Sequence, residues 1–176
     1  MLVVVLVAVS IFAGTVTAMV GQRAVNRESA IATEAARVVV EQMHNQRFRE
    51  LWARYNSDPA DDPEGAGTAP GQRFAVLGLD PAPGAADGLV GEVVLPTVEA
   101  PGAGPLDPPE LELREDFEHE RLGMPRDLNG DMVVDDEDHS EDFFLLPVLI
   151  HVEWSGCSGT RRIELFTMLC EYRHDS

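Results

Sequence analysis

Apolar residues follow two different patterns in the first third of the chain. From Leu2 to Val20 the chain is largely apolar and contains no charged residue. From Gly21 to Tyr55 apolar residues recur at steps of three and four residues, as on one face of a helix. Neither stretch contains proline. The pattern therefore predicts one continuous helix from Leu2 to Tyr55, about 80 Å long at ~1.5 Å per residue. Its predicted apolar stripe is Val25, Ile31, Ala35, Val38, Val39, Met43, Leu51, Trp52 and Tyr55.

Beyond Tyr55 the pattern changes to short alternating stretches between turns. Residues 145–154 (LLPVLIHVEW) and 160–169 (TRRIELFTML) alternate on either side of an SGCSG turn, which predicts a β-hairpin. Its inward face is predicted to carry Val148, Ile150, Val152 and Trp154. Further strands are predicted at 73–79 and 89–96, whereas 111–116 fits a helix or a strand. Segments 56–72, 80–88 and 99–110 are rich in Pro, Gly and acidic residues and predict loops.

These elements predict an α+β fold in which a long N-terminal helix packs on a small antiparallel β-sheet. Residues 1–56 form the helical part, and residues 57–176 form a β-rich globular domain. Charge follows nearly the same division. Residues 1–57 hold six arginines and four acidic residues, whereas residues 58–176 hold seven arginines against 27 acidic side chains. The net charge of −18 argues against binding nucleic acid, which requires clustered positive charge.

The uncharged run from Leu2 to Val20 reaches the roughly 20 residues that a helix needs to cross a bilayer. We therefore expect a membrane-spanning helix. The alternative is a cleaved signal peptide, with Thr17-Ala18 as a small-residue cleavage site. No basic segment precedes the run, and the run is longer than the usual apolar core of a signal peptide. Both features favour the membrane helix.

The order of these parts resembles the type IV pilin and pseudopilin family. LVVVLVAVSIFAG is similar to the segment that follows the prepilin peptidase motif of that family, and PVLIHVEWSGCSGTRRIEL is similar to a late hairpin of minor pilins and pseudopilins. The motif itself, Gly-Phe-Thr-Leu-Ile-Glu, is missing here. On this resemblance we expect the reading frame upstream of Met1 to encode a basic leader and that motif, because basic residues mark the cytoplasmic side of a span.

The resemblance implies a structural subunit of a type IV pilus or a type II secretion-like apparatus, with other pilin or pseudopilin subunits as partners of its helix. It also implies a single-pass protein of the cytoplasmic membrane, with residues 57–176 on the extracytoplasmic side. The sequence does not distinguish a pilus from a secretion or uptake machine. The alternative function is a membrane-tethered or secreted calcium-binding adhesion module of the dockerin type, but a dockerin normally has two calcium loops.

One motif has the residue types and spacing of a metal-binding loop. Residues 127–138 read DLNGDMVVDDED, which places oxygen ligands at the spacing of an EF-hand or dockerin calcium loop. The predicted ligands are Asp127, Asn129, Asp131, the carbonyl of Val133, Asp135 and Asp138. Met132 stands where such loops need a residue with positive φ, usually glycine, and a bulky residue resists that conformation. A solvated acidic loop is the alternative interpretation.

Other chemistry is poorly supported. Two cysteines and five histidines are too few and too scattered for a zinc framework, and His119, His139 and His151 lack zinc-site spacing. Ser155 and Ser158 lie in a turn rather than in a nucleophile elbow. Cys157 and Cys170 would be ~33 Å apart along an extended strand, too far for a disulfide. We therefore expect no enzyme activity.

Overall fold

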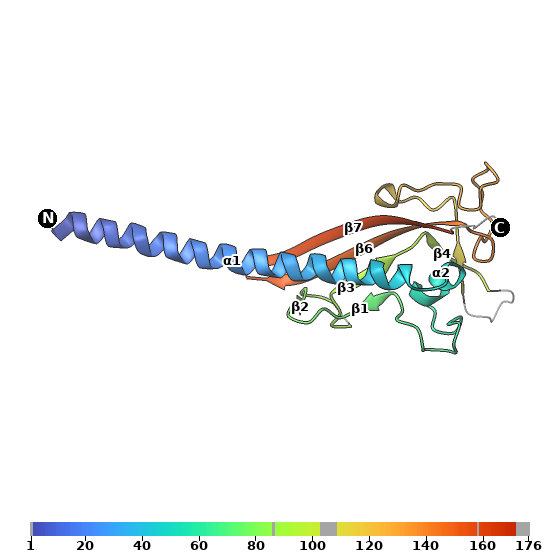
Figure 1. Ribbon diagram of the computed structural model, residues 1–176, viewed down its shortest axis with the longest axis horizontal. Helices are drawn as coiled ribbons and strands as arrows, with labels where there is room; N and C mark the ends of the chain where they lie inside the picture. Colours follow the sequence, from blue (N-terminus) through green and yellow to red (C-terminus); the bar gives the residue numbers. More distant parts are fainter. Residues whose placement is uncertain (1, 86, 103–108, 158, 172–176) are drawn as a thin grey trace.

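The computed structural model describes residues 2–85, 87–102, 109–157 and 159–171; the side chains of residues 2–11 and 13–18 also lie outside the description. The molecule consists of a long N-terminal helix and an antiparallel sheet, which confirms the predicted α+β class. Helix α1 spans Leu2–His44, about 65 Å at ~1.5 Å per residue. Its C-terminal half packs along the domain, whereas its N-terminal half projects beyond it (Figure 1).

The predicted membrane span from Leu2 to Val20 falls mostly on side chains outside the description. Among the residues that the structure describes, no helix combines the length and the apolar character that crossing a bilayer requires.

The helix is not continuous to Tyr55 as predicted. After His44 the backbone turns, Arg47 is extended, and the chain continues as a 3₁₀ turn η1 (Phe48–Glu50) and a short helix α2 (Leu51–Tyr55). The amides of Asn45 and Gln46 bond to carbonyls three residues earlier, which is typical of a tightening last helical turn. The bend buries Leu51, Trp52 and Tyr55 in the domain, so apolar burial outweighs the helix propensity of residues 45–47.

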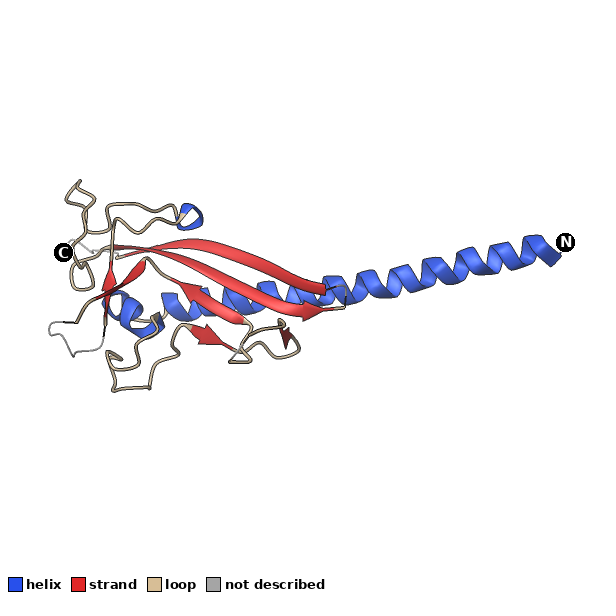
Figure 2. Cartoon of the chain, turned by 180° about the vertical axis from the view of Figure 1, so that it is seen from behind, coloured by secondary structure: helices blue, strands red, loops and turns tan. Residues whose placement is uncertain are grey.

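The main sheet is built around the predicted C-terminal hairpin. Strands β6 (Leu145–Gly156) and β7 (Gly159–Cys170) pair antiparallel over their whole length. Along its other edge, β6 pairs with β3 (Gly91–Val94) and then with β2 (Asp80–Pro81), and β3 pairs with β1 (Arg73–Phe74). Figure 2 shows this sheet lying against the helix. The hairpin is therefore confirmed, whereas the strand predicted at 73–79 is confined to Arg73–Phe74.

A second, two-stranded sheet was not expected. Strand β4 (Thr97–Ala100) pairs with β5 (Glu110–Leu113), although 99–110 was predicted to be a loop; residues 103–108 lie outside the description. Strand β5 resolves the ambiguity at 111–116. A 3₁₀ turn, η2 (Glu120–Leu122), follows. The free cysteines agree with the predicted separation, because Cys170 lies opposite Leu145 at the far end of the hairpin from Cys157.

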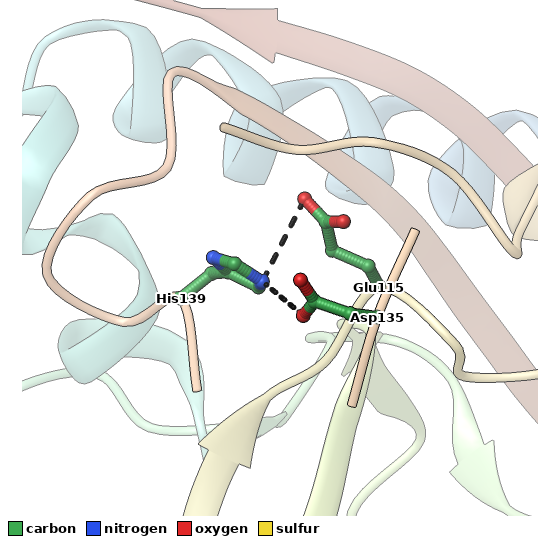
Figure 3. Close-up of side chains that lie close together, drawn as sticks. All are labelled: Glu115, Asp135 and His139. Atoms are coloured by element: carbon green, nitrogen blue, oxygen red, sulfur yellow. Dashed lines mark hydrogen bonds and ion pairs between the residues drawn. The ribbon is translucent and has the colours of Figure 1, made fainter. Parts of the chain in front are cut away.

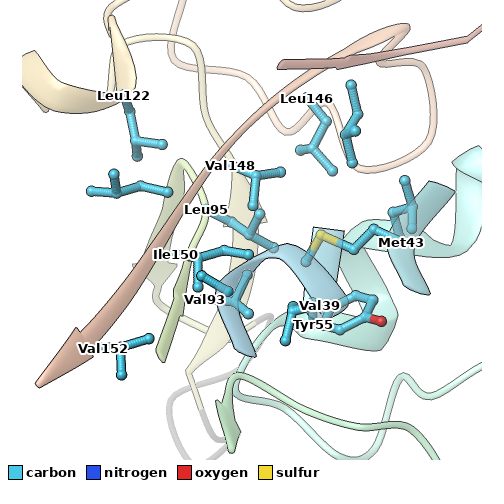
Figure 4. Close-up of a cluster of buried hydrophobic side chains, with 14 of the residues drawn as sticks. Val39, Met43, Tyr55, Val93, Leu95, Leu122, Leu146, Val148, Ile150 and Val152 are labelled. Carbon is cyan, nitrogen blue, oxygen red and sulfur yellow. The ribbon is translucent and has the colours of Figure 1, made fainter. Parts of the chain in front are cut away.

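The core lies between α1, α2 and the sheet (Figure 4). Val148, Ile150, Val152 and Trp154 are buried as predicted. On α1 the buried positions are Ala32, Ala36, Val39 and Met43, whereas Val38 is 40 % exposed. The helix is therefore rotated from the predicted stripe. Two alanines on the buried side allow the helix backbone to approach the sheet closely.

Candidate metal centre

The acidic loop, residues 127–138, lies between η2 and β6 and is attached to β5. Asp138 accepts a hydrogen bond from the amide of Leu113 at 2.9 Å, and the amide of His139 donates to the carbonyl of Leu113 at 2.9 Å. Leu128, the second residue of the loop, and Phe143, which follows the loop, are fully buried. These apolar anchors hold a strongly charged segment against the domain, as burial of large side chains stabilises their position.

The first half of the acidic loop folds around three predicted calcium ligands. Asp127 accepts hydrogen bonds from the amides of Gly130 and Met132. Asn129 accepts one from the amide of Asp131 at 3.0 Å, and Asp131 accepts one from Val133 at 2.7 Å. Such side-chain to backbone bonds two to five residues along the chain are the usual way in which Asp and Asn stabilise turns.

Met132 adopts the conformation that a bulky residue was expected to resist. Its φ is 71°, in the left-handed region, which costs a residue with a Cβ about 1–2 kcal/mol. Its side chain is 93 % exposed and so meets no packing obstacle. The hydrogen bonds that Asp127 accepts from the amides of Gly130 and Met132 offset this backbone cost.

The predicted ligands Asp135 and Asp138, in the second half of the acidic loop, contact other groups. Asp138 accepts hydrogen bonds from Leu113 and Ser140. Asp135 accepts one from the amide of Glu137 and lies 3.1 Å from Nε2 of His139. Among the described His, Cys, Asp and Glu side chains, one group of three has ligand atoms within 4.8 Å of one another: Glu115, Asp135 and His139. We call this group the Glu115 cluster. Asp135 is the one predicted ligand that belongs to it.

The Glu115 cluster joins three parts of the chain (Figure 3). Glu115 follows β5, and its exposed fraction is 0 %; His139 follows the acidic loop, and its exposed fraction is 3 %. Nε2 of His139 lies 3.8 Å from Oε1 of Glu115 and 3.1 Å from Oδ1 of Asp135. The other ring nitrogen, Nδ1, lies 3.0 Å from Oδ1 of Asp142. The imidazole is therefore placed between three carboxylates.

Backbone groups fix Glu115 in place. Its Oε1 accepts hydrogen bonds from the amides of Leu128 at 2.5 Å and Asn129 at 3.2 Å. Its Oε2 is buried and has no hydrogen-bond partner among the residues described. A buried carboxylate oxygen without a partner is costly.

The surrounding charges shift the protonation of this group. Burial lowers the pKa of His139, but the hydrogen bonds to Asp135 and Asp142 and the charge of Glu115 outweigh burial, so the pKa is raised overall. The pKa of Asp135 is lowered, chiefly by the amide of Glu137 and then by His139. In the absence of a metal, the imidazole is therefore biased towards its charged form.

One nitrogen and two carboxylates form a donor set that can hold a divalent ion. Glu115 was not predicted, because it lies well upstream of the acidic loop in the sequence and only the fold brings it there. His139 was not predicted either, because no second histidine or cysteine stands at zinc spacing. The available signal was that His139 follows Asp135 at a helix-like step in an acidic segment.

No family model, curated protein or solved structure matches the chain.

Proposed function

We propose that the chain is a structural subunit of the pilin type, a minor pilin or pseudopilin of a type IV pilus or a type II secretion-like apparatus. The observation that supports this is the shape of α1. Its contacts with the hairpin begin near Val25 and Glu28, where Arg161 and Trp154 reach the helix. The preceding residues extend past the hairpin turn (Figure 1). A helix that leaves its own domain is suited to packing against helices of neighbouring subunits.

The character of the projecting half supports the same role. Residues 2–20 carry no charge, and Met19 and Val20 are 65 % and 62 % exposed. We place this half in the cytoplasmic membrane before assembly, with the acidic domain on the extracytoplasmic side. Other pilin or pseudopilin subunits are the proposed partners, and the role is structural rather than catalytic. In the alternative, a secreted dockerin-like adhesion module would leave the projecting half of α1 without a role, and a membrane-tethered one would use it only as an anchor.

Helices in lipid associate through close approach at small residues, and Gly21 provides a test of such packing. Gly21 is exposed, and an added Cβ there would meet no atom within 4 Å. Gly21→Leu should therefore leave the subunit folded but obstruct a neighbouring helix. The measurement places a photo-reactive amino acid at exposed Gln22 of the full chain and quantifies crosslinked adducts in the membrane fraction of producing cells.

We expect adducts with further copies of this chain or with other subunits that have a long N-terminal helix. Gly21→Leu should lower their yield several-fold without lowering the unfolding temperature. Thr33→Leu is the matched control, because Thr33 is exposed on α1 beside the domain rather than on the projecting half. Unchanged yields in Gly21→Leu, or adducts only with unrelated proteins, would exclude helix-mediated assembly.

Calcium is the ion that we propose for the first half of the acidic loop. Asp127, Asn129 and Asp131 are hard oxygen ligands at calcium-loop spacing, and Met132 has the positive φ that this position of such a loop requires. The region from Asp127 to Asp142 carries eight acidic residues and neither lysine nor arginine. A divalent cation would offset their mutual repulsion, which acts within the ~8 Å screening length at physiological salt.

Thermal unfolding of the full chain in millimolar calcium and in chelator tests this proposal. At 100 times the dissociation constant, a bound ion adds about 2.7 kcal/mol to the free energy of unfolding. We expect a dissociation constant of about 10⁻⁴–10⁻³ M, as in extracellular modules. Asp127→Ala combined with Asp131→Ala should remove the stabilisation. A midpoint that does not respond to calcium would leave the segment a solvated acidic loop.

A further inference from the structure

A second group of candidate cation ligands lies in the same region but has different chemistry. We propose that Glu115, Asp135 and His139 bind a divalent first-row transition metal, for which zinc is the representative probe. The bound ion would connect the end of β5 to the segment that leads into β6. This site is separate from the calcium proposal, since it uses neither Asp127 nor Asp131.

The first argument is the unpartnered oxygen of Glu115. This carboxylate is fully buried, and Figure 3 shows one of its oxygens facing the imidazole of His139 while the other is turned away. One of its oxygens is held by two amides, whereas Oε2 has no hydrogen-bond partner within the described part of the chain. Among the described residues, the one basic group paired with Glu115 is His139, whose Nε2 lies 3.8 Å from Oε1, the oxygen that the two amides hold. Buried charges are normally paired or coordinate a metal, and a pairing as long as 3.8 Å leaves room for an ion.

The second argument is the spacing of the donor atoms. Zinc binds imidazole nitrogen and carboxylate oxygen at about 2.0–2.2 Å in tetrahedral sites, which places any two donors about 3.3–3.6 Å apart. Nε2 of His139 lies 3.1 Å from Asp135 and 3.8 Å from Glu115, values on either side of that range. Shifts of a few tenths of an ångström would bring these two pairs into that range, and all three donor atoms already lie within 4.8 Å of one another.

The donor types favour a transition metal over calcium. Calcium takes six to eight oxygen ligands, whereas imidazole suits zinc and its neighbours in the first row. Three protein ligands leave a fourth position for water. Asp135 is partly exposed, with 31 % of its side chain accessible, so solvent and an incoming ion can reach the cluster from this side.

Asp142 supplies the outer contact that ligating histidines commonly have. A metal-bound histidine usually donates its other ring N–H to a carboxylate, which fixes the ring and the tautomer. Oδ1 of Asp142 lies 3.0 Å from Nδ1 of His139. A proton on Nδ1 leaves the lone pair of Nε2 directed at Asp135 and Glu115. The same arrangement is explained without metal by a protonated imidazole between carboxylates, and the experiment must separate these two states.

Isothermal titration of the chelator-treated full chain with Zn²⁺, and separately with Ca²⁺, separates them. We expect one zinc ion per chain. Glu115→Gln keeps the size of the side chain and an oxygen acceptor for the two amides but removes a ligand charge. It should weaken zinc binding by at least about 100-fold, as should His139→Gln, because losing an outer contact alone costs about 10–100-fold. Calcium binding should not change in either variant.

Variants outside the Glu115 cluster serve as controls for zinc binding, and variants of the calcium ligands are tested with both metals. Asp136→Asn removes an exposed charge from the same loop outside the cluster and should leave zinc affinity within about twofold, a loss small beside the ~10-fold minimum of an outer contact. Asp127→Ala with Asp131→Ala should remove calcium binding and retain zinc binding. Failure of either metal proposal is therefore visible without failure of the other, and neither depends on the assembly assay.

Folding of the variants does not decide the outcome. If Glu115→Gln or His139→Gln fails to fold, Asp142→Asn remains informative, because the Asp142 side chain is 59 % exposed. It should weaken zinc binding by about 10–100-fold. Absence of zinc binding by the unsubstituted chain, or zinc affinity unchanged in Asp142→Asn and in whichever ligand variants fold, would overturn the proposal and identify the cluster as an imidazolium ion pair.

Discussion

At the residue scale, Gly91 shows how closely β3 and β1 approach each other. A Cβ built on Gly91 would lie 2.2 Å from ring atoms of Phe74, far inside van der Waals contact. Gly91→Ala should therefore lower the free energy of unfolding by about 1–3 kcal/mol, the usual cost of overpacking. For a chain of this size, that corresponds to an unfolding temperature lower by roughly 2–10 °C.

The measurement is calorimetric unfolding of the full chain. Gly21→Ala is the matched control, because an added Cβ there meets open space and alanine favours the helix. Truncating the ring should make room, so Gly91→Ala should cost less in a Phe74→Ala background than alone. Equal costs in both backgrounds would show that Phe74 is not the obstacle.

Met132 gives a second prediction at this scale. Glycine adopts the positive φ found here without the steric cost that methionine has, although it also gains entropy in the unfolded chain. Met132→Gly should leave stability within about 1 kcal/mol of the original and should strengthen calcium binding. Met132→Val should destabilise the loop, since β-branched residues resist positive φ. Calcium titration and thermal unfolding of both variants check this, and tighter binding by the valine variant would contradict it.

Met132 also shows where sequence reasoning at this scale ends. The rule that bulky residues avoid positive φ is a preference of about 1–2 kcal/mol. The turn outweighs this preference because two amides bond to Asp127 and the side chain stays in solvent. Glu115 marks a different limit, because no local pattern states that a glutamate in an alternating acidic segment becomes fully buried.

At the element scale, the elements with the strongest local sequence pattern were the ones predicted correctly. The hairpin β6–β7 alternates over many residues around a Gly-containing turn, and both strands were found where expected. The strands β4 and β2 lie at or beside proline-rich segments, where local composition favours loops, and only pairing with distant partners forms them. The break after His44 also depends on distant contacts, because it allows Leu51 and Trp52 to be buried in the domain.

The prediction at this scale concerns the contact between α1 and the end of the hairpin. Nε1 of Trp154 donates to Oε2 of Glu28 at 3.2 Å, and Arg161 lies 5.8 Å from the centroid of the indole ring. Trp154→Phe removes the donor and leaves part of the space unfilled. We expect a loss of about 2–4 kcal/mol, from one hydrogen bond to a charged group together with lost burial.

Glu28 provides the matched test of the same bond. Glu28→Gln keeps an oxygen acceptor and should cost less than about 1 kcal/mol, whereas Glu28→Ala should cost about 1–2 kcal/mol. Hydrogen exchange of the amides around residue 28 should accelerate in Trp154→Phe and in Glu28→Ala if this contact holds the helix to the hairpin. Equal protection in all variants would place the docking energy elsewhere along α1.

At the scale of the whole molecule, electrostatic repulsion between domains opposes the helix packing that we propose for assembly. In the assembly that we propose, the projecting half of α1 brings subunits together. Residues 58–176 carry a net charge of −20, from seven arginines against 27 acidic side chains, and this charge would repel copies of the domain. Exposed apolar residues buried in such an assembly would offset part of that repulsion. Leu77 is 99 % exposed beside Val38, over an apolar hollow of about 700 Å³ between α1 and the segment that follows β1.

This opposition predicts that assembly depends on ionic strength. The screening length falls from about 30 Å at 0.01 M salt to about 3 Å at 1 M, so repulsion between acidic domains weakens while helix packing is little affected. With chelator present to exclude divalent ions, adduct yields from the Gln22 crosslinker should rise several-fold between about 0.01 M and about 1 M sodium chloride. Replacing the exposed Asp136, Glu137 and Glu141 by their amides should raise the yield at low salt and reduce its salt dependence. A yield that falls with salt would mean that attraction between charged groups, rather than apolar helix packing against a repulsive background, brings the subunits together.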